Sequence, residues 1–569
     1  MAPMNRRELL QASAGALALA ACGPRRGDAP AEPPPTQQQH RGPGAGATSQ
    51  HPATDVGVRI LEAGGNAADA AVAIAAALNV GEPTSTGLGG DCFALYYDAA
   101  TRALTALNGS GRAPAALTID LIRSQGVTTP ELPMLSVHAI TVPGACAGWC
   151  DLLARHGSLP LASVLAPAIE LAEDGFPIGE LTAHAWERAI TLYAAVPSFR
   201  EMTIDGRAPR PGERFRNPGL ARALRQIAAG GADAFYRGDI AAAIAAAVRA
   251  AGGVMTTDDL AAHRSTWDAP ISTTYRGFRV WECPPNGQGV TALLALNLLA
   301  DFDLAALDPL GPDRMHLLIE AMRVAFADTR WYVADPAFHQ VPVAELLSPE
   351  YARSRRALID PRRAAADVRR GAPVAGSDTV YFCVVDGFGN ACSFINSNYG
   401  GFGTGLVPAG WGFTLQNRGA CFRLDPAHPN ALAPRKRPYH TIIPGMLTWP
   451  DGSLYGPFGV MGGFMQPQGH VQVLVAMLDD AQRPKPALDR PRFCLDPVDG
   501  AVVVNLEEGV PEATARELAA RGHQLVTGVS GDKRALFGRG QIILRGPGGA
   551  LDAGSDPRAD GYARIAASG

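Results

Sequence analysis

The chain has 569 residues, of which 47% are hydrophobic and 18% charged, and its formal net charge is −4. This composition allows a large buried core, which excludes a disordered chain. No basic run is long enough to follow a phosphate backbone, so we expect no nucleic-acid partner. The expected partners are small molecules or peptides.

The first 22 residues have the layout of a bacterial export signal. Paired arginines precede an apolar stretch, residues 12–21, that is too short to span a membrane. The L-A-A-C that ends at Cys22 resembles a lipoprotein cleavage box, in which the cysteine becomes the lipidated first residue. This pattern predicts an exported lipoprotein, periplasmic or on the cell surface, that meets the membrane only through its lipid anchor. The alternatives are an uncleaved anchor or a misassigned start site.

A tether and then a folded body are predicted to follow this signal. Residues 23–48 are rich in Pro, Gly, Ala and polar residues, which is typical of a disordered segment, and the body is expected to begin near Ser49. From residue 55 the apolar pattern predicts two helices that break at Gly64-Gly65. Helices continue to about residue 353, and strands with glycine turns dominate beyond residue 376. This order favours an α+β or layered αββα fold.

Neither the cysteines nor the histidines predict a metal site. No C-x-x-C spacing occurs, and Cys383 and Cys392 are expected to be buried as small hydrophobic residues. His316 and Glu320 lie four residues apart on a predicted helix without a third ligand, so the preferred interpretation is a polar pair on the helix surface. We expect no metal and no cofactor.

Two local patterns leave a catalytic role open. In G-S-D-T-V-Y-F-C-V-V-D-G-F-G-N, residues 376–390, the pair Asp378-Thr379 stands directly before a predicted core strand. Thr379 is either the first residue of that strand or a reactive hydroxyl. Gly462-Gly463 precedes an apolar segment, residues 471–478, that predicts a helix. The pair either permits a tight turn, which the spacing favours, or presents backbone N–H groups to an anion.

Several ordered blocks carry a resemblance to a known family. The blocks are G-G-N-A-A-D-A-A-V-A at 64–73, E-P-T-S-T-G-L-G-G-D at 82–91, V-P-G-A-C-A-G-W at 142–149, D-T-V-Y-F-C-V-V-D-G-F-G-N-A at 378–391, F-G-T-G at 402–405, K-R-P at 436–438 and S-D-P-R at 555–558. From about Ser49 to its end, the chain resembles the γ-glutamyltransferase (glutathione hydrolase) family of N-terminal-nucleophile hydrolases. The resemblance implies a four-layer αββα sandwich.

The resemblance also implies self-cleavage between Asp378 and Thr379. The Thr379 hydroxyl would attack the Asp378 carbonyl, and water would hydrolyse the resulting ester. A large fragment, residues 49–378, and a small fragment, residues 379–569, would stay together as a heterodimer. The new α-amine has an ordinary pKa of about 7.7 to 8 and would serve as the base for the hydroxyl of its own residue.

The remaining catalytic roles follow from the same resemblance. Ser397 matches a hydroxyl residue that hydrogen-bonds the nucleophile, and Gly462 and Gly463 match the glycines of the oxyanion hole. The implied reaction is attack on a γ-glutamyl amide such as glutathione, followed by resolution of the acyl-enzyme. Hydrolysis is favoured over transfer to an acceptor amine.

The expected substrate pocket departs from the family pattern in three places. Cys421 stands where the family has an aspartate for the glutamyl α-amino group, Arg418 replaces an amide-bearing contact, and Tyr399 replaces an asparagine. An unpaired arginine and a missing negative charge hold a substrate ammonium poorly. An acyl group without the amino group is therefore plausible.

Two further positions concern the substrate carboxylate. His440-Thr441 align with a serine pair that binds this group in the family and retain hydrogen-bond donors. Arg112 lies two residues beyond the position of the family's carboxylate-binding arginine, and it is either a substrate contact or structural.

Three functions remain open. The leading prediction is an amide hydrolase for γ-glutamyl compounds. The runner-up is an amidase for a glutaryl- or oxamate-like acyl group, because the departures resemble a divergent branch with cephalosporin acylase-like and oxamate amidohydrolase-like members. A lipid-anchored binding protein on an inactive enzyme scaffold is the third, and the retained Thr379, Ser397 and Gly462-Gly463 argue against it.

Overall fold

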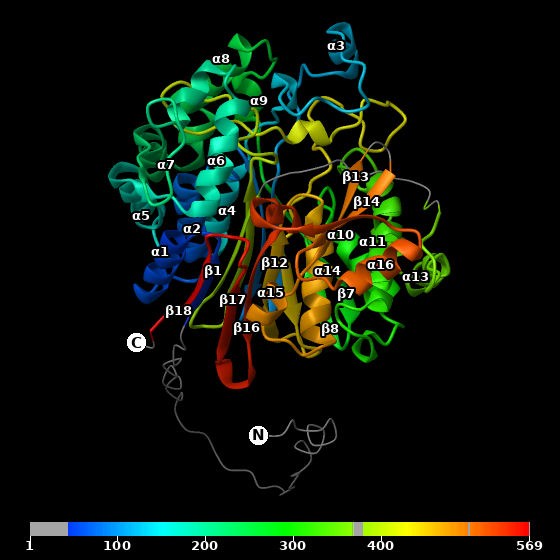
Figure 1. The fold of residues 1–569 in the computed structure, drawn as a ribbon. Helices are drawn as coiled ribbons and strands as arrows, with labels where there is room; N and C mark the ends of the chain where they lie inside the picture. The colour runs from blue at the N-terminus through cyan, green and yellow to red at the C-terminus, as the bar shows by residue number, and fades with distance from the viewer. Residues whose placement is uncertain (1–43, 367, 369–378, 499–500, 568–569) are drawn as a thin grey trace, which may run out of the picture. The chain divides into compact units, whose positions relative to one another are not determined.

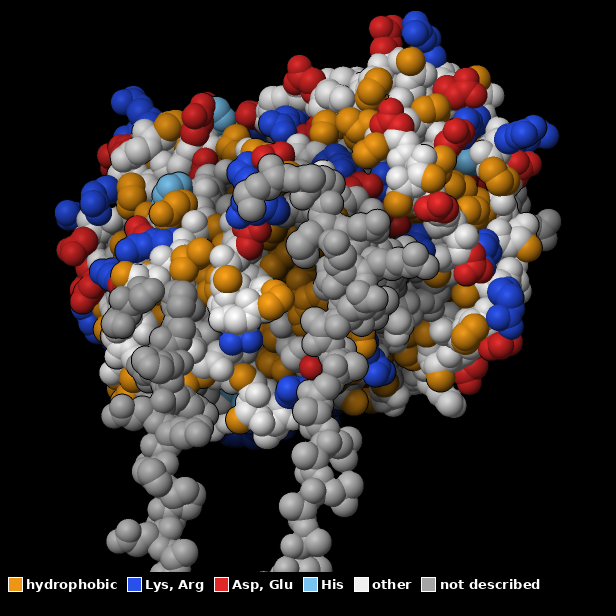
Figure 2. Space-filling view, turned by 90° about the horizontal axis from the view of Figure 1, so that it is seen from below, with side chains coloured by type: hydrophobic (Ala, Val, Ile, Leu, Met, Phe, Trp, Pro, Cys, Tyr) orange, Lys and Arg blue, Asp and Glu red, His pale blue; other side chains and the backbone are white. Residues whose placement is uncertain are grey.

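A computed structural model describes residues 44–366, 368, 379–498 and 501–567. The export signal with Cys22, most of the predicted tether, and Asp378 lie outside these residues. Within the described ranges, no helix combines the length and the apolar character needed to cross a membrane. On the face shown in Figure 2, acidic and basic side chains are interspersed, in keeping with the small net charge.

Helices and strands both contribute extensively to the fold (Figure 1). The α-helices are α1 His51–Glu62, α2 Ala67–Gly81, α3 Ile119–Ser124, α4 Ala145–His156, α5 Leu161–Asp174, α6 Glu180–Leu192, α7 Pro218–Tyr236, α8 Asp239–Ala250, α9 Thr257–Ala261, α10 Gly289–Leu299, α11 Pro312–Tyr332, α12 Val343–Leu346, α13 Pro349–Arg356, α14 Met465–Leu478, α15 Pro484–Asp489 and α16 Glu512–Ala520. The predicted pair of helices broken at Gly64-Gly65 is confirmed, and Asn66 begins α2 with a reciprocal capping box to Asp69.

Two large sheets organise the strands. One has the order β18-β1-β9-β10-β2-β3-β6, and the other has the order β17-β16-β12-β11-β8-β7. The first comprises β18 Tyr562–Ile565, β1 Ala45–Thr48, β9 Val380–Val385, β10 Ala391–Ser397, β2 Asp91–Asp98, β3 Ala103–Gly109 and β6 Thr266–Asp268. The second comprises β17 Leu551–Ser555, β16 Arg539–Arg545, β12 Leu454–Met461, β11 Gly445–Thr448, β8 Phe278–Glu282 and β7 Ile271–Tyr275. Smaller sheets contain β13 Phe493–Val498, β14 Ala501–Glu507 and β15 Gln524–Val529, and β4 Phe176–Pro177 with β5 Arg214–Phe215.

Strand β9 is apolar throughout because both of its faces are buried. Val380, Phe382 and Val384 join a core cluster with residues of α1 and α2, whereas Tyr381, Cys383 and Val385 join a cluster that contains residues of both large sheets. Alternate side chains of a strand point to opposite faces, so a continuous apolar run is needed there. The predicted core strand and the burial of Cys383 and Cys392 are confirmed.

The two large sheets contact each other, and helices contact each of them. Strands β9 and β1 of the first sheet contact β16 of the second, and β10 contacts β12. Helix α2 packs against β9 and β10, while α10 contacts β7 and β8, and α14 contacts β12. These contacts produce a mixed helix-and-sheet fold with its core divided between the helix–sheet and sheet–sheet interfaces.

The predicted tether extends too far. Residues Ala45–Thr48 form strand β1, which is fully buried and pairs antiparallel with β9 on one side and β18 on the other. Alanine and glycine have little preference for strands, so the short A-G-A-T sequence gives no local signal of one. The folded body begins before Ser49.

The predicted surface pair of His316 and Glu320 is also wrong, because both side chains are fully buried. His316 Nδ1 lies 2.8 Å from His523 Nε2, and its Nε2 lies 2.7 Å from the Asp360 carbonyl oxygen. Glu320 forms an ion pair with Arg323. Helix α11 packs against α16, and this long-range contact buries a polar face that helical spacing alone marks as exposed.

Candidate active site

Two hydroxyl side chains meet where β9 begins and β10 ends. Val380 pairs with Asn396 across these antiparallel strands, so Thr379, one residue before β9, faces Ser397, the last residue of β10. Thr379 Oγ1 lies 3.0 Å from Ser397 Oγ, and both residues are fully buried. The register of two core strands thus fixes the distance between the predicted nucleophile and its predicted partner.

The Ser397 hydroxyl is held by two further donors. The backbone N–H of Tyr399 donates to Ser397 Oγ at 2.9 Å, and Arg418 Nη2 donates to the same oxygen at 3.1 Å. Tyr399 has a φ of +77°, which is rare for a bulky residue. This conformation accompanies a stacked arrangement, in which the Arg418 guanidinium lies 4.3 Å from the centre of the Tyr399 ring.

Arg418 is a buried cation beside these hydroxyls. It is fully buried, and its Nη1 donates to Thr441 Oγ1 at 2.7 Å. Among the described residues, its Nε has no hydrogen-bond partner and no carboxylate forms an ion pair with the guanidinium. Burial raises the pKa of the neighbouring Cys421 thiol despite the opposing effect of Arg418, so Cys421 is neutral at pH 7. Among the described residues, two hydroxyls, an aromatic ring and the neutral Cys421 thiol therefore surround the guanidinium.

A carboxylate that the sequence analysis missed connects these elements. Asp91, the first residue of β2, pairs with Ser397 in the sheet register. Its carboxylate accepts hydrogen bonds from Gly111 N and Gln416 Nε2, both at 2.9 Å, and lies 3.0 Å from His440 Nε2. Asp91 thus connects strand β10 with Gln416, two residues before Arg418, and with His440, the residue before Thr441. Its sequence signals are its position at the end of the block at 82–91 and its charge at the start of a mostly apolar strand.

His440 faces Asp91 rather than open space. Burial and the charge of Arg418 lower the pKa of His440 to about 3, so the ring is neutral at physiological pH. Nδ1 accepts from Ile442 N at 3.4 Å, which leaves the proton on Nε2 to be donated to Asp91. His440 therefore fixes the backbone that carries Thr441.

Asp91→Asn is expected to reduce kcat/KM for amide hydrolysis by about 100-fold, because an amide NH₂ cannot accept from all three donors and small displacements of reacting groups are costly. The measurement is steady-state kinetics on the cleaved protein, with its melting temperature recorded in parallel. Asp69→Asn is the matched control, since Asp69 is equally buried and hydrogen-bonded at the start of α2. Equal losses of kcat/KM in both variants would mean that Asp91 contributes to the stability of the fold and has no specific part in catalysis.

The Gly462-Gly463 pair lies between β12 and α14. Both glycines have positive φ, +132° and +60°, as the turn interpretation requires. Helix α14 begins at Met465, six residues before the predicted start. The sequence did not indicate this first turn because it contains polar residues and Pro467 and has no apolar helical period. Proline is tolerated in the first turn of a helix. Within the described part of the chain, no acceptor receives the N–H of either glycine. The glycine pair therefore has the geometry of a tight turn, and its two N–H groups, which have no acceptor among the described residues, lie near the start of helix α14.

Another residue missed from sequence, Gln288, links this glycine turn to the Thr441 segment. Its Nε2 donates to the carbonyl oxygens of Gly463 at 2.8 Å and Thr441 at 2.7 Å, and Tyr439 donates to its Oε1 at 2.9 Å. Gln288 is fully buried. One amide thus fixes two loops that are far apart in the sequence, which no local pattern indicates.

The structure does not bring Arg112 into this cluster. Its Nη1 donates to the Arg264 carbonyl oxygen at 3.4 Å. No hydrogen bond in the described ranges joins Arg112 to Thr379, Ser397 or Arg418. Among the predicted carboxylate contacts, Thr441 is the one that reaches Arg418.

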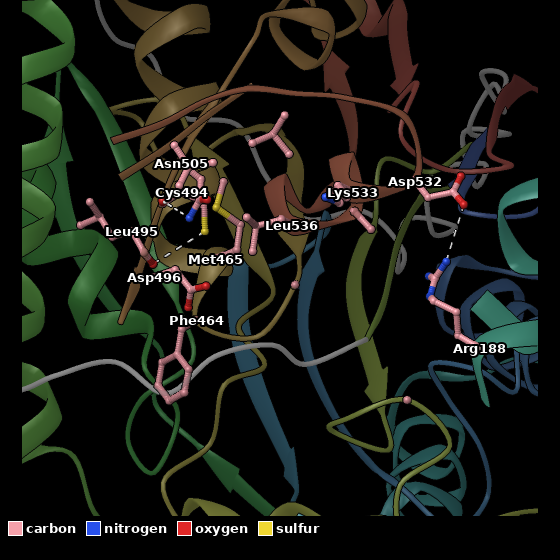
Figure 3. A pocket seen from close by; sticks show the side chains of 15 residues that line it. Arg188, Phe464, Met465, Cys494, Leu495, Asp496, Asn505, Asp532, Lys533 and Leu536 are labelled. Carbon is pink, nitrogen blue, oxygen red and sulfur yellow. Dashed lines mark hydrogen bonds and ion pairs between the residues drawn. The ribbon is translucent and has the colours of Figure 1, made fainter. Parts of the chain in front are cut away.

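A pocket of about 830 Å³ borders the glycine turn (Figure 3). Gly462, Phe464 and Met465 form one part of its lining, and Gly401, two residues beyond Tyr399, forms another. No group of three or more His, Cys, Asp or Glu side chains suited to a metal occurs among the described residues.

Comparison with known proteins identifies the family of this chain. The model of the family described as gamma-glutamyltranspeptidase matches residues 53–566. The solved structure of cephalosporin acylase from Bacillus halodurans has 45% identity and a TM-score of 0.85, covering 94% of this chain and 98% of that one. The glutathione hydrolase-like YwrD proenzyme of Bacillus subtilis is 40% identical over 515 residues, 90% of this chain and 96% of the relative. The oxamate amidohydrolase proenzyme of Klebsiella pneumoniae is 35% identical over 532 residues, 91% and 98% of the two chains.

The fold and these neighbours place the chain among the N-terminal-nucleophile hydrolases. Within that class, the chain belongs to the gamma-glutamyltranspeptidase family, as its sequence blocks indicate.

Proposed function

We propose that this protein is a self-cleaving amidohydrolase whose acyl substrate carries a carboxylate and no α-ammonium group. Thr379 is the nucleophile, Ser397 positions its hydroxyl, and the N–H groups of Gly462 and Gly463 stabilise the oxyanion. The 3.0 Å contact between Thr379 and Ser397 and the open glycine donors support these roles. The contacts between the two large sheets and their helices support the four-layer αββα arrangement.

Maturation and catalysis use the same hydroxyl. First, Thr379 Oγ1 attacks the carbonyl carbon of Asp378, and the peptide C–N bond breaks as the hydroxyl proton passes to the nitrogen, which becomes the Thr379 α-amine. Water then hydrolyses the ester, which leaves a carboxylate on Asp378 and restores the Thr379 hydroxyl. In turnover, this amine takes the hydroxyl proton as Thr379 attacks the substrate amide, and it then returns the proton to the departing amine. Water releases the acyl group from the threonine ester.

The buried Arg418 carries the proposal about the acyl group. A buried cation without an anion is costly, and a substrate carboxylate would complete its hydrogen bonding as a bidentate partner. Hydrogen bonds of 3.1 and 3.0 Å join Arg418 to Ser397 and Ser397 to Thr379, so the guanidinium lies within about 6 Å of the nucleophile. A dicarboxylic half-amide with a short acyl chain could therefore place its second carboxylate at Arg418 while its amide carbonyl lies at Thr379.

Hydrolysis of γ-glutamyl compounds such as glutathione is the second candidate, favoured by the relative named as glutathione hydrolase-like. The γ-glutamyl group also carries a carboxylate for Arg418. Its α-ammonium, however, would lie near a guanidinium and a neutral Cys421 thiol, where like charges repel and no anion compensates. The site geometry thus favours the amino-free acyl group.

A matched substrate series tests this choice. Glutaryl, γ-glutamyl and valeryl anilides share one leaving amine, and the γ-glutamyl and valeryl compounds each differ from the glutaryl compound in a single group on the acyl chain. We expect kcat/KM to fall on the order of 100-fold from glutaryl to valeryl, because the Arg418 partner is lost. From glutaryl to γ-glutamyl we expect a fall of about 10-fold from the added ammonium.

Two outcomes would overturn parts of the proposal. A preference for the γ-glutamyl anilide would establish the second candidate, and equal rates for glutaryl and valeryl anilides would remove Arg418 from acyl recognition.

We also propose that the enzyme lies outside the cytoplasm, where a lipid anchor at Cys22 attaches it to a membrane. The export-signal pattern of its first residues supports this location.

A further inference from the structure

A small cavity outside the candidate active site lies between α11, α14, α15 and β13 (Figure 1). Helices α11 and α14 contact each other, and both contact β13. The cavity has a volume of about 20 Å³, which is room for one water molecule or one ion of similar size. Any ligand bound there is therefore a single small species and not an organic substrate.

Arginines dominate the polar lining of this cavity. Arg314 lies near the start of α11, and Arg490 and Arg492 lie in the segment between α15 and β13. None of the described lining residues is acidic. The lining also contains Gln472, whose side-chain oxygen already accepts a hydrogen bond from the Phe493 N–H at 3.0 Å. The side chains around the cavity therefore offer many hydrogen-bond donors and few acceptors.

Several guanidinium nitrogens of these arginines lack a partner. Arg314 is 1% exposed, and its Nη1 donates to Asp480 Oδ1 at 2.9 Å and to the Leu307 carbonyl oxygen at 3.3 Å. Among the described residues, neither Nε nor Nη2 of Arg314 has a hydrogen-bond partner, and the same holds for Nε of the buried Arg492. A buried donor without an acceptor is destabilising. A single acceptor bound in the cavity could satisfy donors of both arginines, which are far apart in the sequence.

The charges at the cavity are also unbalanced. Arg314 and Arg490 share one carboxylate, that of Asp480, at 2.9 and 2.6 Å. Arg492 lies 2.7 Å from Asp556, whose carboxylate also pairs with a further arginine. Burial lowers the pKa of Arg492 to about 10 despite Asp556, and its guanidinium stays charged at pH 7. Three cations therefore line the cavity, and the described part of the chain supplies at most two carboxylates to them.

These features favour an anion over a water molecule. A water molecule would bring two donors of its own to a lining rich in donors, and it would add no negative charge. A halide ion accepts from several donors at once and offsets the excess positive charge. We infer that this cavity binds one halide ion, such as chloride, which links α11 to the segment before β13 and stabilises the fold. This inference goes beyond the proposed amidohydrolase function and does not rest on it.

Thermal unfolding at constant ionic strength tests this inference. Sodium gluconate, whose anion is too large for the cavity, is replaced stepwise by sodium chloride or sodium bromide. We expect Tm to rise on the order of 1 °C for each tenfold increase in halide above its Kd, because a ligand of the native state stabilises it by mass action. A Tm that does not change on this exchange would overturn the inference.

Two variants locate the effect. Arg490→Gln removes a cation of the lining whose side chain is 18% exposed, and it leaves Asp480 paired with Arg314. The rise of Tm with halide should be lost or strongly reduced in this variant. Arg483→Gln, the matched control, removes an exposed arginine paired with Asp552 and should retain the full rise. A rise that persists unchanged in Arg490→Gln would place the halide elsewhere and contradict the inference.

Diffraction from crystals of the unaltered protein in bromide gives the position of the ion without any variant. We expect an anomalous difference peak within hydrogen-bonding distance of Arg314 Nε or Nη2 and of Arg492 Nε. A water molecule at this place, or bromide peaks confined to the surface, would overturn the inference. Neither measurement uses amide hydrolysis, so an inactive enzyme that still bound bromide here would contradict the proposed function alone.

Discussion

Thr379→Ala is expected to leave the chain uncut and without amidase activity. The substitution removes the hydroxyl that would attack both the Asp378 carbonyl and the substrate, and loss of a nucleophile lowers kcat by at least about 10⁴-fold. A denaturing gel of the purified protein should show one full-length band. The unaltered protein should show two bands, of roughly two-thirds and one-third of the chain.

Thr379→Ser is the matched control, because serine keeps the hydroxyl and loses one methyl group. This variant should still be cut, and it should hydrolyse the glutaryl anilide at a reduced but measurable rate. Cleavage that persists in Thr379→Ala would place the reactive group at another residue. An unaltered protein that never splits would instead support the binding protein on an inactive scaffold.

Arg418→Gln is expected to remove the preference for a carboxylate on the acyl group. For the glutaryl anilide, kcat/KM should fall on the order of 100-fold, because the substrate carboxylate would lie buried without its cation. For the valeryl anilide the decrease should be much smaller. The measurement is the ratio of kcat/KM for the two anilides, which cancels damage shared by both reactions.

This internal ratio matters because Arg418 also holds Ser397 and Thr441. A general disturbance of the hydroxyls would lower both rates equally and leave the ratio unchanged, and that result would contradict carboxylate recognition. Arg418→Lys keeps the positive charge but not the planar fork of donors, so its ratio should lie between those of the unaltered enzyme and Arg418→Gln.

The parts of the fold that sequence predicts well are those with a strong local period. Strand β9 and helices α1 and α2 follow from runs of apolar residues, because burial repeats along each element. Strand β1 does not, since its four residues are small and their burial depends on partners hundreds of residues away. Burial of His316 likewise depends on His523, which no helical pattern contains.

The residues of the candidate site also fall into those that the sequence could indicate and those that it could not. Pattern alone leaves Thr379 and the glycine pair ambiguous, and the family resemblance supplies their expected roles. The Asp91–His440 contact joins residues 349 positions apart, so neither spacing nor composition could indicate it. Arg418 could be predicted as a departure from the family. That no carboxylate among the described residues pairs with it could be seen only once the neighbouring side chains were placed.

The interleaved order of the first large sheet has a consequence for maturation. Strands β9 and β10, which follow Thr379, lie between β1 and β2, which precede it. A break before Thr379 would create two new chain ends but would leave every strand beside the same neighbours. Separating the fragments would require both ladders flanking this strand pair to open together. Dilution alone should therefore not dissociate them, and neither fragment is expected to fold without the other.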